Sequence, residues 1–407
     1  MTEELLDAPA SPVPLLRPAD GLPAVVKDRA QLDRTAQEFA AGDGPIAVDA
    51  ERASGFRYSQ RAYLVQLRRA GAGTALVDPI PLGGDLSPLA PALTGPEWVL
   101  HAASQDLTCL AEVGIQPERL FDTELAGRLA GLPRVGLGPL VEQLLGLTLE
   151  KGHGAADWSR RPLPEDWLVY AALDVEVLVE LRDVLAGLLA EQGKLEWAEQ
   201  EFEAVRTAGP PAPRAEPWRR VSGIHKIRKP RALAAVRALW EARDKLAAER
   251  DIAQGRVLPD AAIVDAALSA PPTAQALAAM PVFRGRSQRR LTNYWFAALA
   301  QAAALEPSGL PAASPPNDGP PAVARWADRD PDAAARLAAA RAVLLATSEE
   351  RSVPVENLLL PDLLRRLCWT PPPDGDIPTA LRKGGAREWQ IELLAEKLDA
   401  ALHTTAK

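Results

Sequence analysis

Two proline-rich stretches limit how this 407-residue chain can fold. Residues 207–217 (TAGPPAPRAEP) and 306–322 (EPSGLPAASPPNDGPPA) have the composition of linkers. Proline has no backbone N–H and clashes inside a helix, so neither stretch can continue one. The chain is also too long for one ordinary hydrophobic core. We therefore expect three domains, over residues 20–206, 218–305 and 323–407.

The composition is that of a globular protein in a reducing compartment. Apolar residues make up 47% of the chain and charged residues 25%. The two cysteines, Cys109 and Cys368, exclude a disulfide scaffold or a thiolate zinc site and fit a reducing cytosol. Residues 1–10 are acidic and lack the basic start of a signal peptide, and no apolar run is long enough to span a membrane. We expect a cytoplasmic protein without membrane contact.

The first segment alternates between strand and helix patterns. Short β-branched and apolar runs predict strands at 45–49, 62–68, 74–77 and 98–102. Apolar residues at helical spacing predict helices at 106–113, 137–145 and 165–189. This alternation favours a mixed sheet flanked by helices.

The second and third segments have all-helical patterns. Residues 231–253 are rich in Ala, Arg, Leu and Glu and carry a helical stripe of apolar residues. The stretches that begin at Ala242 and Ala340 also resemble each other. Each predicts a helix, a short extended bridge and a second helix near a Pro-Asp pair, at 259–260 and 361–362. This similarity indicates an internal duplication.

Five residues form candidate chemical motifs. Asp49 and Glu51 lie two apart on a predicted strand, so their side chains share a face. Asp106 lies at a predicted strand–helix junction, where an acid often caps the helix. Tyr170 and Asp174 lie four apart on a predicted helix and also share a face. Taken singly, each motif is better explained without chemistry, as solvated surface acids, as a helix cap or as one face of an amphipathic helix.

Taken together in chain order, the motifs resemble those of the DEDD exonuclease superfamily, in the tyrosine-bearing branch that includes ribonuclease D. The matching sequences are DAE (49–51), HAASQDL (101–107) and YAALDV (170–175). FRYSQRAYLVQL (56–67) and DWSRRPLPED (157–166) also resemble ribonuclease D. The order and context of these matches distinguish them from unrelated surface acids. The helical segments resemble the HRDC domain that ribonuclease D shares with RecQ-type helicases.

The sequence departs from this family at two places. Trp167 stands where a polar residue is common. Gly152-His153-Gly154 stands where a bulkier apolar residue is common. Both departures concern contacts to the substrate strand, and the carboxylates are intact.

The resemblance implies a fold and a reaction. The expected fold is an α/β ribonuclease-H-like exonuclease domain, with a mixed sheet and flanking helices, followed by two all-α HRDC-like domains. The expected activity is that of a 3′–5′ exoribonuclease, a hydrolase of the 3′-terminal phosphodiester that releases nucleoside 5′-monophosphates. The usual role in the family is trimming of tRNA precursors and other structured RNA, so RNA is the expected partner.

The resemblance also implies a metal site. Two divalent cations, Mg²⁺ or Mn²⁺, roughly 3.5–4 Å apart would stabilise the attacking and leaving oxygens, and carboxylates are suitable ligands for such hard cations. By resemblance, Asp49 bridges both ions, Glu51 and Asp174 complete one, and Asp106 holds the other. Tyr170 orients the attacking water. Because its ordinary pKa is near 10, deprotonation of that water must come mainly from the metal.

The charge of the chain is unevenly distributed. The net charge is −8, which is unusual for a nucleic-acid-binding protein. Residues 214–256, however, contain twelve Lys and Arg against five Asp and Glu, and residues 219–231 contain six positive charges and no acid. A local basic face is sufficient to bind phosphates.

The candidate nucleic-acid contacts lie in that basic stretch. They are Arg219, Arg220, Lys226, Arg228 and Lys229, with Trp218 as an aromatic surface. A second cluster, Arg284, Arg286, Arg289 and Arg290 with Tyr294 and Trp295, extends the same predicted track. The alternative is a solvated junction between a linker and a helix.

Other residues and functions remain open at this stage. His101 is expected to have a structural role near Asp106, while Lys151, Arg160 and Arg161 either meet phosphates or are solvated. One alternative function is a 3′–5′ DNA exonuclease, because recognition of RNA requires a contact to the 2′-hydroxyl that no residue reports. Another is a nucleic-acid-binding protein without catalysis, which the presence of all five motif residues disfavours. No obligate protein partner is evident.

Overall fold

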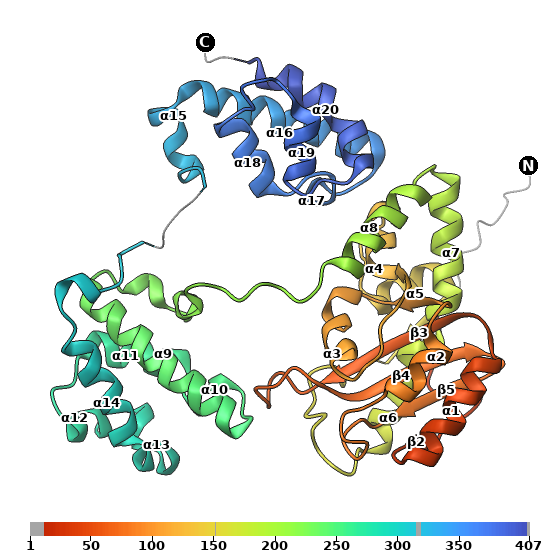
Figure 1. The fold of residues 1–407 in the computed structure, drawn as a ribbon, viewed down its shortest axis with the longest axis horizontal. Helices are drawn as coiled ribbons and strands as arrows, with labels where there is room; N and C mark the ends of the chain where they lie inside the picture. The colour runs from red at the N-terminus through yellow and green to blue at the C-terminus, as the bar shows by residue number, and fades with distance from the viewer. Residues whose placement is uncertain (1–11, 151, 315–318, 405–407) are drawn as a thin grey trace, which may run out of the picture.

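The computed structural model describes residues 12–150, 152–314 and 319–404 (Figure 1). The expectations for residues 1–10, for Lys151 and for the middle of the stretch 306–322 lie outside this description. Within it, no helix is long and apolar enough to cross a membrane. Residues 208–216 contain no helix or strand, and Figure 1 shows them as an extended connection after the first segment, as the proline content predicts.

The first segment is built on a mixed sheet, as expected. Among the described residues, the strands run across the sheet in the order β2 (Val25–Val26), β5 (Gly73–Val77), β4 (Ala62–Ala70), β3 (Asp43–Arg52), β6 (Glu97–Leu100) and β7 (Arg119–Asp122). The central strand β3 pairs antiparallel with β4 and parallel with β6. A separate parallel pair joins β1 (Val13–Leu15) to β8 (Leu147–Leu149). The short strands β1, β2, β7 and β8 were not predicted.

Helices cover the sheet. They are α1 (Arg29–Ala41), α2 (Ala90–Leu93), α3 (Leu107–Glu112), α4 (Thr123–Leu129), α5 (Leu137–Leu145), α6 (Glu165–Glu176), α7 (Leu178–Glu191) and α8 (Leu195–Thr207). The single helix predicted at 165–189 is therefore two helices, separated at the buried residue Val177. Helices α6 and α7 both pack on β3, which brings the first turns of α7 and the last turns of α6 close to the centre of the sheet.

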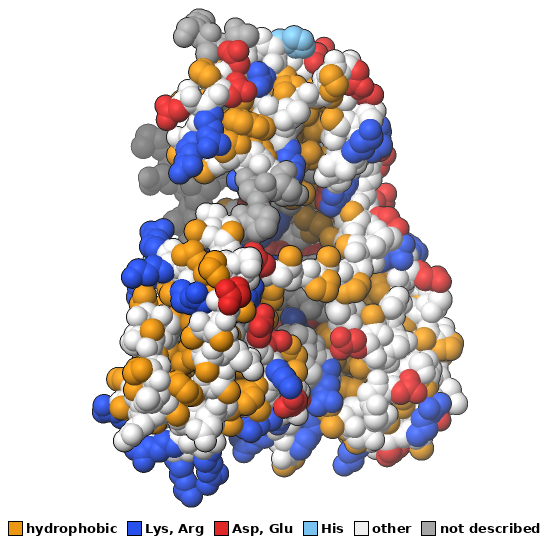
Figure 2. Space-filling view, turned by 60° about the vertical axis from the view of Figure 1, so that its left-hand side comes forward, with side chains coloured by type: hydrophobic (Ala, Val, Ile, Leu, Met, Phe, Trp, Pro, Cys, Tyr) orange, Lys and Arg blue, Asp and Glu red, His pale blue; other side chains and the backbone are white. Residues whose placement is uncertain are grey.

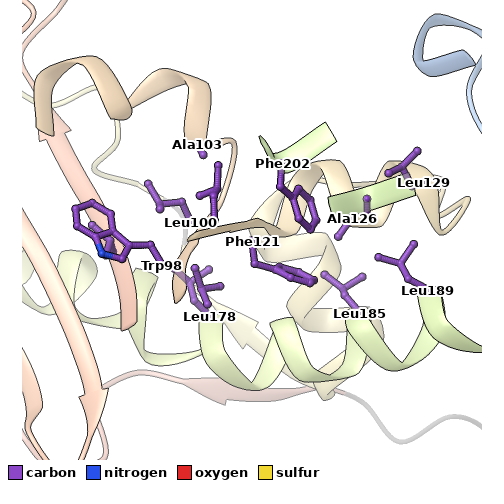
Figure 3. Packing of buried hydrophobic residues seen from close by; sticks show 14 of the residues in the cluster. Trp98, Leu100, Ala103, Phe121, Ala126, Leu129, Leu178, Leu185, Leu189 and Phe202 are labelled. Carbon is purple, nitrogen blue, oxygen red and sulfur yellow. The ribbon is translucent and has the colours of Figure 1, made fainter. Parts of the chain in front are cut away.

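The core of the first segment lies between the sheet and α7 and α8. Figure 3 shows Phe121 of β7 facing Phe202 of α8, and their ring centroids are 4.7 Å apart. Leu178, Leu185 and Leu189 of α7 are fully buried on the same side. The burial of these apolar side chains supplies most of the driving force that holds the helices on the sheet.

The second and third segments are all-helical, as expected. The second contains α9 (Pro230–Arg250), α10 (Gln254–Val257), α11 (Asp260–Ser269), α12 (Ala274–Ala278), α13 (Arg286–Arg290) and α14 (Thr292–Ala303). The third contains α15 (Trp326–Arg329), α16 (Pro331–Arg351), α17 (Val355–Leu358), α18 (Pro361–Trp369), α19 (Ile377–Lys383) and α20 (Glu388–Leu402).

The two helical segments repeat one succession of elements. Helices α9 and α16 are both 21 residues long. Each is followed by a residue in the left-handed region, Asp251 (φ 47°) and Ser352 (φ 49°). A four-residue helix comes next, α10 in one segment and α17 in the other, and then α11 or α18. The bridge predicted as extended thus contains a helical turn, and the repeated order supports an internal duplication.

Both helical segments contact the first segment. The loop after β3 holds the second one, because Tyr58 Oη donates a hydrogen bond to Asp244 (3.0 Å) and Arg256 Nε donates one to the carbonyl of Gly55 (2.7 Å). The third segment packs on α8, where the rings of Trp197 and Trp389 stack with centroids 4.7 Å apart. Specific side-chain contacts therefore join each helical segment to the first segment.

Candidate active site

Three carboxylates converge beside the central strand. Asp49 and Glu51 lie on β3, and Asp174 lies near the end of α6, which packs on β3. One ligand oxygen from each of the three lies within 4.8 Å of the others. The alternation of side chains along β3 places Asp49 and Glu51 on one face, as the sequence predicts. Packing of α6 then brings Asp174 to that face.

Asp106 reaches the same cavity from the opposite wall. It occupies the N-cap position of α3, but its side chain makes no capping hydrogen bond. The turn before it is fixed by Asp122, which accepts hydrogen bonds from the backbone N–H groups of Ala102 (3.1 Å) and Ala103 (2.8 Å). The Asp106 carboxylate instead forms an ion pair with Arg52, whose Nη2 lies 3.3 Å from Asp106 Oδ1. The capping alternative is therefore wrong for this residue.

Tyr170 lies one turn before Asp174 on α6 and lines the cavity. Its ring meets the ring of His153 edge-on, with centroids 5.6 Å apart. Burial, and then the negative charges of Asp174 and Glu51, raise the pKa of Tyr170 far above its ordinary value. The hydroxyl therefore stays protonated at neutral pH and serves as a hydrogen-bonding group.

The cavity that these residues share has a volume of about 430 Å³. His101 lines it, and His101 Nδ1 lies 2.9 Å from Thr123 Oγ1. Burial lowers the pKa of His101 to about 4, so its ring is neutral at physiological pH. These contacts agree with the structural role expected for this histidine.

The carboxylates of the site are buried close together, which favours binding of a cation. Burial, as the largest cause, raises the pKa of Asp49 to about 6, that of Glu51 to about 10 and that of Asp106 to about 8. Neighbouring carboxylates raise the pKa values of Glu51 and Asp106 further, and burial with Asp49 raises that of Asp174. Buried carboxylates that lie this close together stay ionised at neutral pH only when a positive charge offsets them, and otherwise take up protons. An all-oxygen, acidic donor set is the type that binds hard divalent cations. The site therefore fits divalent metal ions.

The segment before α6 is held in place by structural contacts. Arg161 donates to both carboxylate oxygens of Asp78 at 2.7 Å and to the carbonyl of Tyr63 at 2.8 Å. Arg161 thus anchors this segment to the sheet, whereas Arg160 is exposed. Trp167 packs against Trp158, with ring centroids 5.3 Å apart, which gives this departure from the family a packing role.

The sequence interpretation missed Arg52. This arginine lines the cavity directly beside Glu51, and its charge lowers the pKa values of Asp49, Glu51 and Asp106. Its position directly after the DAE motif was the sequence feature that could have identified it as a residue of the site. Strict alternation along a strand would have turned its side chain away from the carboxylates.

The prediction that tryptophans form an exposed aromatic surface in the basic stretch is wrong. Trp218 is only 3% exposed, and Arg219 stacks on it and pairs with Glu216 at 2.6 Å. Trp295, expected beside the second cluster, is fully buried and donates to Gln288. Both indoles fill the core of the second segment, so they cannot stack on bases.

The other basic side chains are available to a ligand. Arg220, Lys226, Arg228 and Lys229 are exposed, and the last three line a cavity of about 770 Å³ together with Arg231. Arg284, Arg286, Arg289 and Arg290 are also exposed. Figure 2 shows Lys and Arg side chains gathered along the lower edge of the molecule.

Comparisons with family models agree with this arrangement. Residues 23–190 match a model described as 3′-5′ exonuclease, residues 232–299 match the HRDC domain, and residues 319–402 match a model described as 3′ to 5′ exonuclease C-terminal domain. The fold and the acidic site thus define a 3′–5′ exonuclease with helical domains behind its catalytic domain.

Whole-chain relatives identify the family. Ribonuclease D of Gluconacetobacter diazotrophicus is 32% identical over 338 residues, which cover 81% of this chain and 82% of that protein. Ribonuclease D of Nitrobacter hamburgensis is 30% identical over 369 residues, covering 88% and 90%. This chain belongs to the ribonuclease D family.

Solved structures give the same result. A protein from Bifidobacterium adolescentis is 39% identical, with a TM-score of 0.90, and covers 97% of this chain and 100% of its own. RNase D of Escherichia coli, described as an exoribonuclease involved in structured RNA processing, is 26% identical with a TM-score of 0.69 and coverage of 94% and 99%. The expected fold, a mixed-sheet exonuclease domain followed by helical domains with an HRDC domain, is confirmed.

Proposed function

We propose that this protein removes nucleotides one at a time from the 3′ ends of RNA, trimming tRNA precursors and other structured RNA in the cytoplasm. One observation carries the proposal. Asp49, Glu51, Asp106, Tyr170 and Asp174, which are far apart in the sequence, line a single cavity. Their order and types resemble the motifs of the ribonuclease D family, to which the chain belongs.

The carboxylates act as the ligands of two divalent cations, Mg²⁺ or Mn²⁺. Asp49, Glu51 and Asp174 would hold one ion, because one ligand oxygen of each lies within 4.8 Å of the others. Asp106 and Asp49 would hold the other. When bound, such ions lower the pKa of a bound water and stabilise negative charge on the attacking and leaving oxygens.

Tyr170 orients the attacking water. Its hydroxyl is protonated because burial and Asp174 raise its pKa, so it can donate one hydrogen bond and accept another. A hydrogen bond between Tyr170 and Asp174 holds this hydroxyl beside the carboxylates. Orientation of a reactant in this way lowers the entropic part of the barrier.

The helical segments bind the body of the RNA. We propose the division into a catalytic domain (20–206), an HRDC domain (218–305) and a second HRDC-like domain (323–407). We expect phosphates to contact the exposed cations of the basic stretch, which are Arg220, Lys226, Arg228 and Lys229. Arg219, which packs on the Trp218 ring, adds positive charge beside them.

The test compares RNA with DNA. A 5′-labelled oligoribonucleotide and the oligodeoxyribonucleotide of the same sequence are incubated with the full chain in Mg²⁺, in Mn²⁺ and in EDTA. We expect a ladder shortening from the 3′ end of the RNA, release of nucleoside 5′-monophosphates, and no reaction in EDTA. Equal or faster degradation of the DNA would favour the DNA exonuclease alternative. Binding without any cleavage would favour the catalytically inactive alternative.

A further inference from the structure

Arg52 is a positive charge inside an acidic cavity. Among the described residues that line this cavity, it is the one arginine or lysine. Its side chain is 25% exposed, whereas that of its partner Asp106 is 7% exposed. The guanidinium therefore lies at the boundary between the buried carboxylates and the solvent from which a substrate enters.

Arg52 lies at the end of β3, beside an irregularity of the sheet. Strand β3 pairs with β4 through Glu51–Leu64 and then through Arg52–Ala62, so β4 has one extra residue, Tyr63, between the two pairs. This β-bulge interrupts the regular pairing at the point where β3 ends. At this strand end the Arg52 side chain reaches Asp106, although its neighbour Glu51 also lines the cavity.

Arg52 makes one ion pair among the described residues, the one with Asp106. A guanidinium carries five N–H donors, and Arg52 makes no other hydrogen bond or ion pair that the described residues show. Arg161, by contrast, is fixed by both oxygens of Asp78 and by backbone carbonyls. Arg161 is anchored, whereas Arg52 keeps donors available for a second partner.

Asp106 is also the carboxylate that stands apart from the others. The compact group of ligand oxygens contains Asp49, Glu51 and Asp174. Arg52 therefore offsets the charge of the one acid that faces the group from the wall of α3. A cation that binds Asp106 Oδ1 must compete with the guanidinium for that oxygen.

We infer that Arg52 is a positioning residue, which pairs with Asp106 while no cation is bound to that carboxylate. When a cation binds Asp106, the Arg52 guanidinium instead contacts a phosphate of the substrate. This inference rests on the proposed function for its second half, the phosphate contact. A guanidinium suits that exchange because it is always protonated and its planar fork matches carboxylate and phosphate oxygens alike. The first half, competition between Arg52 and a cation for Asp106, concerns only this chain and a metal ion.

The test uses calorimetric titration of the full chain with Mn²⁺. Arg52→Gln removes the competing charge and keeps a polar side chain, so we expect the Mn²⁺ affinity to rise about tenfold. In an Asp106→Asn background the same substitution should change the affinity less than about twofold, because its partner is gone. The control Arg29→Gln removes an exposed charge from α1 and should leave the affinity unchanged.

Two results would overturn the inference. Unchanged or weaker Mn²⁺ binding by Arg52→Gln would show that the guanidinium does not compete for Asp106. An equal gain in the Asp106→Asn background would show that Arg52 acts through another group. Because Arg52→Lys keeps the charge, wild-type Mn²⁺ affinity in that variant, alongside the gain in Arg52→Gln, would support competition by charge and exclude damage to the fold.

The phosphate contact has a separate readout. The Michaelis constant for a short oligoribonucleotide should rise about tenfold in Arg52→Gln and be largely restored in Arg52→Lys. An unchanged Michaelis constant would overturn the substrate half of the inference. If the full chain hydrolyses no RNA, the proposed function fails, but the Mn²⁺ titrations still decide whether Arg52 competes for Asp106.

Discussion

The indole Nε1 of Trp389 donates a hydrogen bond of 3.0 Å to Oε1 of Glu201, joining α20 of the C-terminal segment to α8 of the catalytic domain. Arg387 completes the contact, with its Nη2 lying 3.0 Å from the other Glu201 oxygen. Glu201 is 7% exposed, so a buried carboxylate is satisfied from across the junction. Loss of either partner would leave one oxygen of this buried carboxylate without that donor.

Trp389→Ala should therefore destabilise the protein. The ring is 1% exposed, so truncation should cost about 3–5 kcal/mol in the free energy of unfolding. Trp389→Phe keeps much of the ring but removes the donor to Glu201, and should cost about 1–3 kcal/mol. Urea denaturation of the full chain measures both. A loss below about 1 kcal/mol for Trp389→Ala would show that the junction contributes little.

Asp49→Asn should abolish turnover while the fold persists. The substitution removes one of the negative charges that hold the cations, so the rate should fall more than about a hundredfold. In EDTA the variant should melt at the same or a higher temperature, because a buried repulsion is relieved. Asp265→Asn, at an exposed position of α11, is the matched control and should retain activity. Activity of Asp49→Asn above about 1% with an unchanged melting curve would remove Asp49 from the site.

Tyr170→Phe should separate orientation of water from metal binding. The ring stays packed on α6, but the hydroxyl is lost, so the rate should fall roughly ten- to a thousandfold, about 1.4–4 kcal/mol. Calorimetric titration with Mn²⁺ should give the affinity of the unaltered protein. A loss of Mn²⁺ binding in this variant would contradict the assigned role of the hydroxyl.

Metal ions should change how stability depends on pH. The folded protein holds protons on Asp49, Asp106 and Glu51 up to pKa values of about 6, 8 and 10, well above those of the unfolded chain. Between the ordinary carboxyl range and these values the folded state binds more protons, so in EDTA the free energy of unfolding should fall as pH rises.

Excess Mg²⁺ should remove much of that fall, because bound cations favour the ionised carboxylates. Thermal unfolding between pH 5 and pH 9 in EDTA and in Mg²⁺ measures the difference. The double variant Asp49→Asn, Glu51→Gln should have the flatter profile in EDTA and little response to Mg²⁺. Identical profiles with and without Mg²⁺ in the unaltered protein would argue against a cation at this site.

The basic stretch should govern binding of long RNA. Replacing Lys226, Arg228 and Lys229 by Gln should weaken binding to structured RNA and flatten its salt dependence. The slope should fall by roughly 0.7 for each single-strand phosphate that the protein no longer neutralises. Turnover of a short oligonucleotide should hardly change, because such a substrate fits within the catalytic domain.

A matched control removes the same charge elsewhere. Arg29, Arg365 and Arg382 are already paired with carboxylates on α1, α18 and α20, and their replacement should leave the salt slope unchanged. An unaltered slope in the basic-stretch variant would show that this stretch is a solvated junction. Equal losses on short and long RNA would indicate damage to the catalytic domain.

Local patterns in the sequence were sufficient to predict the frame of the site. The alternation and apolar content of residues 45–49 and 62–68 identified the central strands β3 and β4, and helical spacing identified α5 and α6. Side-chain periodicity depends only on nearby residues, so it can be read from sequence. The order of the acidic motifs then predicted the family, which the relatives confirm.

Tertiary packing decided the rest. Trp218 and Trp295 have basic neighbours in sequence, yet both lie in the core, because burial depends on which helices meet and not on adjacent residues. Arg52 lies 3.3 Å from Asp106 of a distant part of the chain, a contact that the local strand pattern could not predict because it depends on where α3 packs. The sequence by itself thus determined which side chains form the acidic site, and the fold determined which charges lie opposite them.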